Sequence, residues 1–159
     1  MSFLKRLFGK GDVGGTASDR LDKLQYVARE VAIDLLREHG TVLPLGLILD
    51  RDDEVVTHYP DKRECEDPND AVVSMCLLVL SWLQEQVESG RATGVAIVTE
   101  LESGDARAIG TQVEVPGAVR AMISPYHQDQ DQYVVDSADD VDDGPLLFDK
   151  YFPFWGRTS

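Results

Sequence analysis

The chain has 159 residues, of which 43% are hydrophobic, and its 29 acidic against 15 basic residues give a net charge of −14 at pH 7. This length and composition are typical of one globular domain that buries a core without disulfides or metal ions. Such a charge disfavours nucleic acid as a direct partner, because phosphate binding needs clustered Lys and Arg and the body of the chain has none. Only two cysteines occur, Cys65 and Cys76, without paired-motif spacing, which predicts a reducing cytoplasm.

Residues 1–15 form a basic amphipathic segment followed by a glycine-rich linker. The apolar side chains recur at helical spacing among the cations, and the stretch is too short for a secretory signal. We expect residues 1–11 either to dock on an anionic membrane surface or a partner, or to fold back as a leader onto the acidic body. The docking candidates are Phe3, Leu4, Lys5, Arg6, Leu7 and Phe8.

Residues 16–128 are expected to form an α+β domain that opens with a helix. Thr16 and Asp19 have the spacing of a capping box, and His39-Gly40 provides a helix end. One apolar stripe follows at three- and four-residue steps. Its members are Leu21, Leu24, Ala28, Val31 and Leu35.

The next segment, "LPLGLILDRDDEVVTHY", predicts a β-hairpin. Leucines at every second position from Leu43 to Leu49 share one face of the first strand, and residues 50–53 form a polar turn. Pro44 has no N–H group to donate, so the paired part of the strand should begin after it.

A second helix is predicted from Asp67-Pro68 to about Gly90. Its body, "AVVSMCLLVLSWL", is apolar nearly all round, so it should be covered on more than one side. We expect a central helix between the sheet and either the first helix or a second subunit, which would make the protein a homodimer. The apolar run is too short to span a membrane.

Three more strands are predicted in "ATGVAIVTELE", "RAIGTQVEV" and "AVRAMIS", the last two joined by a turn at Pro116-Gly117. The fold class is therefore α+β: helix, hairpin, helix and three strands, with an antiparallel sheet of about five strands packed with two helices. This order, with "LGLILDRDDEVV" ahead of an apolar helix, resembles the roadblock and profilin-like domains over about residues 18–126. That resemblance implies a dimerising scaffold, and the chain is also similar to a set of small uncharacterised bacterial proteins.

Residues 129–159 combine an acidic segment with an aromatic tail. The tail either packs across the sheet and closes the core or anchors another protein, since aromatic residues concentrate binding energy at interfaces. The candidate partner-binding residues are Asp129, Asp131, Asp136, Asp139, Asp140, Asp142, Asp143, Tyr151, Phe154 and Trp155.

No sequence pattern for nucleophilic catalysis, phosphate binding or dinucleotide binding is present. His58 and Cys65 flank a polar loop with Asp61 and Glu64, but four zinc ligands at strict spacing are missing. The aspartate runs fail the pattern of a calcium loop, which needs glycine at its sixth position and glutamate at its twelfth. We therefore expect no metal ion and no cofactor.

The carboxylates of Glu100 and Glu102 share one strand face at the i, i+2 spacing of an acid–base pair. Nothing in the sequence marks either residue as buried, so an exposed polar face is the favoured interpretation. No catalytic residue is assigned.

These observations favour a non-enzymatic acidic interaction module, an adaptor or accessory subunit of a bacterial assembly, cytoplasmic or peripheral to a membrane, with a basic protein as partner. Two alternatives stay open. One is an inhibitor of the immunity or antitoxin type that blocks a basic toxin. The other is a small hydrolase or ligand-binding domain that uses the concave face of the sheet.

Overall fold

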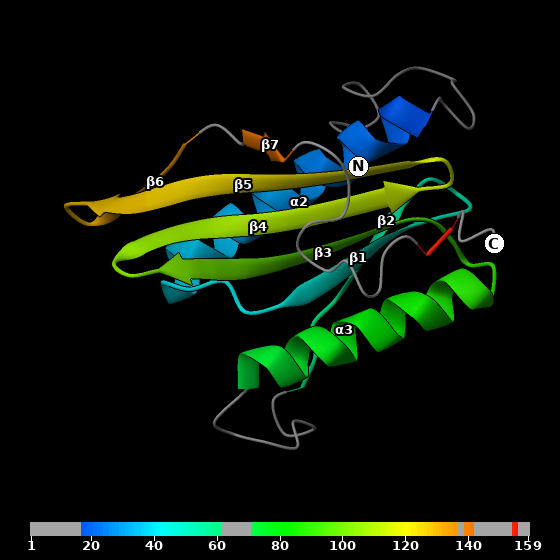
Figure 1. Cartoon of the computed structure of the whole chain (residues 1–159), viewed down its shortest axis with the longest axis horizontal. Coiled ribbons are helices and arrows are strands. Elements are labelled where there is room, and N and C mark those ends of the chain that lie inside the picture. The colour runs from blue at the N-terminus through cyan, green and yellow to red at the C-terminus, as the bar shows by residue number, and fades with distance from the viewer. Residues whose placement is uncertain (1–16, 62–70, 137–138, 142–153, 156–159) are drawn as a thin grey trace.

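Two helices lie on opposite faces of one antiparallel sheet in the computed structural model (Figure 1). The structure describes residues 17–61, 71–136, 139–141 and 154–155. The helices are α2 (Ala17–His39) and α3 (Ala71–Glu88). The expected α+β class and the order helix, hairpin, helix, three strands are confirmed. The predicted docking segment at residues 3–8 lies outside the described residues.

The sheet is built from seven strands, six of which follow one path in the order β2-β1-β3-β4-β5-β6, while β7 pairs separately with β5. Every strand pair is antiparallel. The strands are β1 (Leu45–Asp50), β2 (Val55–His58), β3 (Ala92–Ser103), β4 (Ala106–Val115), β5 (Ala118–Asp129), β6 (Gln132–Val135) and β7 (Asp139–Val141).

The expectation of about five strands was too low, because β6 and β7 were missed. Both lie in the segment that the aspartates marked as acidic, and the charges concealed the alternation of Tyr133 and Val135 on one face. Gln130 takes a positive φ of 57° and closes a tight turn, after which Gln132 pairs back with Asp129. The sheet therefore continues past residue 128, where the sequence analysis ended the α+β domain.

The first hairpin has the predicted position, and its first strand begins at Leu45, directly after Pro44. Leu45, Leu47 and Leu49 pack in the core on the α2 side, as the alternation predicts. Ile48 is buried in the second cluster, on the α3 side. Since both faces of β1 are covered, the strand has no polar side chain before its last residue, Asp50.

The helix α2 buries one stripe against the sheet and ends where the sequence predicts. Gly40 has a φ of 74°, and its N–H donates to the carbonyl of Leu36 over 2.8 Å. In the last turns Ala32 and Leu36 are fully buried, whereas the predicted Val31 and Leu35 are only partly buried. A helix turns by 3.6 residues, so the buried positions drift away from a fixed spacing.

The helix α3 packs on β1 and β3, but it is not wedged between the sheet and the first helix. That expectation was wrong, because α2 covers the opposite face. Met75, Val79 and Leu83 face the sheet, while Val72, Val73 and Leu77 stay exposed. The alternative of a second subunit against α3 stays a prediction. Neither described helix is long and apolar enough to cross a membrane.

Two glycines let the helices approach the sheet closely, one on each face. A Cβ atom on Gly94 would lie 2.7 Å from Cδ1 of Leu24 in α2 and 3.1 Å from Cγ1 of Val115. A Cβ atom on Gly46 would lie 2.9 Å from Cγ1 of Val79 in α3. Both positions are therefore set by packing and not by backbone conformation.

Replacing Gly94 by Ala should lower the free energy of unfolding by about 1–3 kcal/mol, because the added methyl group overpacks the contact with α2. Chemical denaturation monitored by circular dichroism measures the change. In a Leu24→Ala background the methyl group gains room, so the double variant should be more stable than the sum of the two single effects predicts. Strict additivity would contradict the packing explanation.

Candidate functional site

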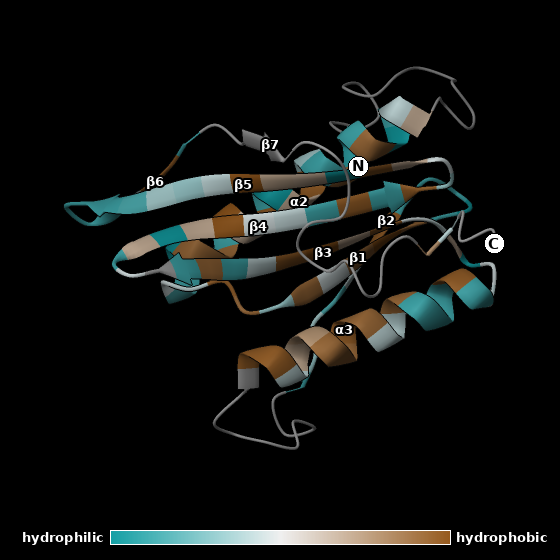
Figure 2. Cartoon of the chain, in the orientation of Figure 1, coloured by the Kyte–Doolittle hydropathy of each residue, from teal (hydrophilic) through white to brown (hydrophobic). Residues whose placement is uncertain are grey.

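Three exposed aspartates lie along the two-stranded ribbon formed by the end of β5 and by β6. We call this ribbon the acidic ribbon (residues 127–136). Asp129 and Asp131 flank the tight turn, and Asp136 follows β6. The hydrophilic colour of this end of the sheet is visible in Figure 2. The aspartates have no Lys or Arg ion-paired to them in the described part of the chain.

The other predicted partner-binding residues are not all placed beside the ribbon. Asp139 and Asp140 belong to β7, which pairs with the middle of β5 at Ile123 and Met122. Asp142, Asp143 and Tyr151 lie outside the described residues. The structure therefore places Asp129 and Asp131 at the turn of the ribbon and Asp136 at its other end, beside Pro125, and the wider acidic surface stays a prediction.

Arg29, in the middle of α2, holds the end of the acidic ribbon. Its guanidinium donates to the carbonyl oxygens of Val135 and Asp136 over 3.3–3.4 Å and to the Ser124 hydroxyl over 3.2 Å. A planar guanidinium suits several acceptors at once, which an ammonium does not. The ribbon is thus fixed to the helix although its tip is exposed.

Other cations hold elements of the fold together. Arg120 on β5 donates to the carboxylate of Asp22 over 2.7 Å and to the side chain of Gln25, which fixes α2 to the sheet. Arg51 donates to the carbonyl oxygen of Gly90 over 2.7 Å, and Lys23 donates to the carbonyl oxygen of Asp53. These cations donate to groups elsewhere in the fold and form no ion pair with the carboxylates of the ribbon.

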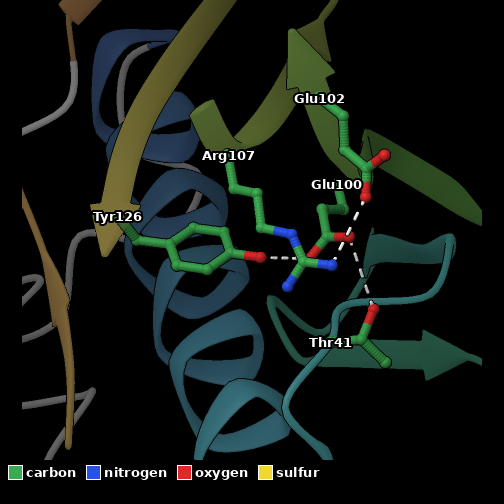
Figure 3. Close-up of polar contacts among 5 residues, drawn as sticks. All are labelled: Thr41, Glu100, Glu102, Arg107 and Tyr126. Carbon is green, nitrogen blue, oxygen red and sulfur yellow. Dashed lines mark hydrogen bonds and ion pairs between the residues drawn. The ribbon is translucent and has the colours of Figure 1, made fainter. Parts of the chain in front are cut away.

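A polar cluster surrounds Glu100 where β3, β4 and β5 lie side by side (Figure 3). The hydroxyl groups of Tyr126 and Thr41 donate to its two carboxylate oxygens, the second over 3.5 Å. Arg107 on β4 forms an ion pair with Glu102 at 3.5 Å. Glu100 and Glu102 thus accept hydrogen bonds that connect three strands and the loop before β1.

Burial, together with the hydrogen bond to Glu100 and its charge, raises the pKa of Tyr126 above its ordinary value. The Glu100 charge likewise raises the pKa of Arg107. The sequence analysis named Glu100 and Glu102 but missed Tyr126, Arg107 and Thr41. The contacts of Tyr126 and Thr41 with Glu100 span 26 and 59 residues, so no local pattern could reveal them, whereas Arg107 lies opposite Glu102 in the β3–β4 hairpin.

In the described part of the chain, no group of three His, Cys, Asp or Glu side chains is arranged to hold an ion. The ring of His58 stacks on Trp82 with centroids 4.6 Å apart. Cys65 and Glu64 lie outside the described residues. Burial raises the pKa of the Cys76 thiol, which also contacts the Thr99 hydroxyl.

The aspartates of the β1–β2 turn stabilise its backbone conformation. Oδ1 of Asp50 accepts the N–H groups of Asp52 and Glu54 over 2.8 and 2.9 Å. Asp53 takes a positive φ of 60°, which aspartate tolerates better than most residues. The carboxylate of Asp50 therefore organises the turn.

Part of the aromatic tail is bound by a buried carboxylate. Glu114 on β4 is only 1% exposed, and its two oxygens accept the backbone N–H groups of Phe154 and Trp155 over 2.6 and 2.9 Å. Both aromatic side chains are half-buried and pack against the core cluster on the α3 side. In this conformation these two residues close the core, the first of the two roles expected for the tail.

Several exposed apolar side chains, which we call the apolar patch, lie along the N-terminal half of α3 and at β2, the outer strand of the described sheet. Figure 2 shows this half of α3 in the hydrophobic colour. Within the described ranges, five of the six exposed large hydrophobic residues belong to it. They are Val56, Tyr59, Val72, Val73 and Leu77. The sequence analysis identified the apolar helix but not which of its sides stays exposed.

A shallow hollow of about 340 Å³ lies between the end of α2 and the acidic ribbon. Its lining residues are Arg37, Asp131, Gln132 and Tyr133. The lining is polar, whereas pockets for small molecules are mostly apolar with a few polar groups. The hollow is therefore weak support for the ligand-binding alternative.

Replacing Tyr126 by Phe should lower the free energy of unfolding by about 1–2 kcal/mol at pH 7, because Glu100 loses a donor. The raised pKa of Tyr126 means that the unfolded chain gives up this proton more easily, so wild-type stability should fall as pH rises above about 10. Denaturation at pH 8–11 measures both effects, and the fall should be smaller in Tyr126→Phe. Tyr133→Phe, which leaves the cluster intact, is the control and should keep the wild-type fall.

Replacing Arg29 by Lys should release the acidic ribbon without unfolding the chain, because one ammonium cannot serve the same acceptors. Amide hydrogens of residues 132–135 should then exchange about tenfold faster, which corresponds to ~1.4 kcal/mol. Arg91→Lys, an exposed position between α3 and β3 and away from the ribbon, is the control. Equal exchange in the two variants would show that Arg29 does not hold the ribbon.

Comparisons with protein-family models, curated proteins and solved structures give no match. The resemblance to roadblock and profilin-like domains therefore gains no support beyond the α+β class. Function has to be argued from the residues themselves.

Proposed function

We propose that the chain is a non-enzymatic, acidic protein-interaction module that binds a basic partner, as an adaptor or accessory subunit does. The acidic ribbon carries this proposal. Three exposed carboxylates lie along one ribbon that Arg29 fixes to α2, and none of them forms an ion pair with a Lys or Arg in the described residues. Like charges held at the rim of a protein speed association with a partner of opposite charge.

The apolar patch supplies a second element of such a module. Its exposed side chains offer hydrophobic contact, and α3 carries no charged residue from position 71 to 84. Contiguous exposed apolar surface on a globular protein commonly marks an interaction site. Charge would thus steer the partner and the apolar patch would supply contact area.

The polar cluster around Glu100 supports the non-enzymatic proposal, because its carboxylates accept hydrogen bonds between strands. Glu100 accepts two hydroxyl donors, and Glu102 pairs with Arg107. An acid–base pair needs two carboxyl groups in environments that separate their pKa values. Here both carboxylates serve as acceptors between strands, which favours a role in stability.

The proposal is tested by neutralising the ribbon. In one variant Asp129, Asp131 and Asp136 become Asn; in the matched control the exposed α2 residues Glu30, Asp34 and Glu38 become Gln, Asn and Gln. Both variants lose three negative charges, so a nonspecific charge effect is the same in each. Binding partners are captured from a lysate of the source cells by chemical cross-linking in low salt.

A basic protein should be recovered with the wild type and the control, with at least tenfold less from the ribbon variant. The recovery should also fall steeply between about 50 and 300 mM salt, because exposed charges are screened at that ionic strength. Equal recovery with both variants would reject the ribbon as the site. Recovery that does not change with salt would reject steering by charge.

A further inference from the structure

The aromatic tail binds to a buried glutamate, Glu114, on β4, which is an inner strand of the sheet. Glu114 pairs across the strands with Val95 on β3 and Val119 on β5, and these neighbours belong to the α3-side core. A carboxylate in such a place is costly unless donors meet both of its oxygens. Here the donors come from main-chain groups 40 and 41 residues further along the chain.

The geometry of this contact has the form of peptide recognition. An ionised carboxylate has only acceptors, and two successive backbone N–H groups each reach one oxygen. The flanking aromatic side chains of Phe154 and Trp155 pack against the buried cluster that contains Val79, Leu83 and Val95. Main-chain bonds in such sites give affinity, and the pockets for side chains give specificity.

We propose that Glu114 and the adjoining α3-side surface form a binding site for an aromatic peptide segment of a partner protein, which the chain's own Phe154 and Trp155 occupy in cis. The segment must offer two successive N–H groups, which excludes proline from both positions. In this chain a proline, Pro153, stands directly before the first paired residue. When the tail leaves, Glu114 loses these two donors, and a partner segment with two adjacent aromatic residues replaces them.

The test uses the full chain with Phe154 and Trp155 both replaced by Pro, which removes both N–H groups and both aromatic side chains, so that the tail no longer occupies the site. The probe is a fluorescein-labelled peptide with the sequence of residues 148–159, and binding is read by fluorescence anisotropy. This variant should bind the peptide at least tenfold more tightly than the wild type, because a tethered tail competes at an effective concentration in the millimolar range.

Two controls separate recognition by Glu114 from simple hydrophobic contact. Adding Glu114→Gln replaces one acceptor oxygen by a donor, so affinity for the peptide should fall at least tenfold. Adding Glu102→Gln instead, an exposed position on the neighbouring strand, should leave the affinity unchanged. A peptide with proline in the position of Trp155 lacks one N–H group and should also bind at least tenfold more weakly.

Absence of peptide binding by a natively folded double variant would overturn the proposal and leave the tail as a cover for the core. Binding that Glu114→Gln does not weaken would overturn it as well. If the double variant does not give a native circular dichroism spectrum, the wild type is mixed with millimolar unlabelled peptide. Faster amide exchange at Phe154 and Trp155 then supports the proposal, and unchanged exchange rejects it. Neutralising the acidic ribbon should not affect any of these results, so this site and the ribbon are tested separately.

Discussion

Burial of β1 and β3 on both faces is the constraint on which the rest of the structure depends. Two helices on opposite faces achieve it, and each approaches the sheet at a glycine where a larger residue does not fit. The helix α3 lies on β1 and β3, while β4 and β5 extend past it. Glu114 sits on that part of the α3-side face, which explains why a backbone segment from the end of the chain binds there.

The distribution of charge follows from the same architecture. Arg29, Arg51, Arg120 and Lys23 bind carbonyl groups or carboxylates that connect α2, the turns and the sheet. A chain with few cations that uses them internally leaves its exposed carboxylates to set the electrostatic field. The acidic ribbon carries three of these carboxylates on an element that Arg29 fixes to α2.

The sequence predicts the elements of this fold well wherever periodicity is clear. Alternating leucines place β1, and Gly40, Gly90 and Gly117 mark ends and turns, each with a positive φ. The strand β6 was missed because a local alternation lay within an acidic stretch. The side of α3 that stays exposed could not be predicted, because a helix that is apolar all round gives no direction.

The candidate sites were less predictable than the fold, and the reason is physical. Asp129, Asp131 and Asp136 could be named because charge is visible in a sequence. The contact between Glu114 and the aromatic tail could not be predicted, because the glutamate in "RAIGTQVEV" has the pattern of a solvent-facing position in a half-buried strand. The burial of Glu114 is visible only in the structure, where the backbone N–H groups of Phe154 and Trp155 bind its carboxylate.

The free edge of the sheet at β2 has a consequence for the behaviour of the protein in solution. Edge strands are commonly protected by charged side chains, yet residues 55–59 carry none apart from His58, whose ring lies against Trp82. Among the described residues, the net negative charge of the protein is then the main repulsion that opposes pairing of β2 edges. Near the isoelectric point of about 4.4 that repulsion vanishes, so concentrated samples should aggregate most readily there.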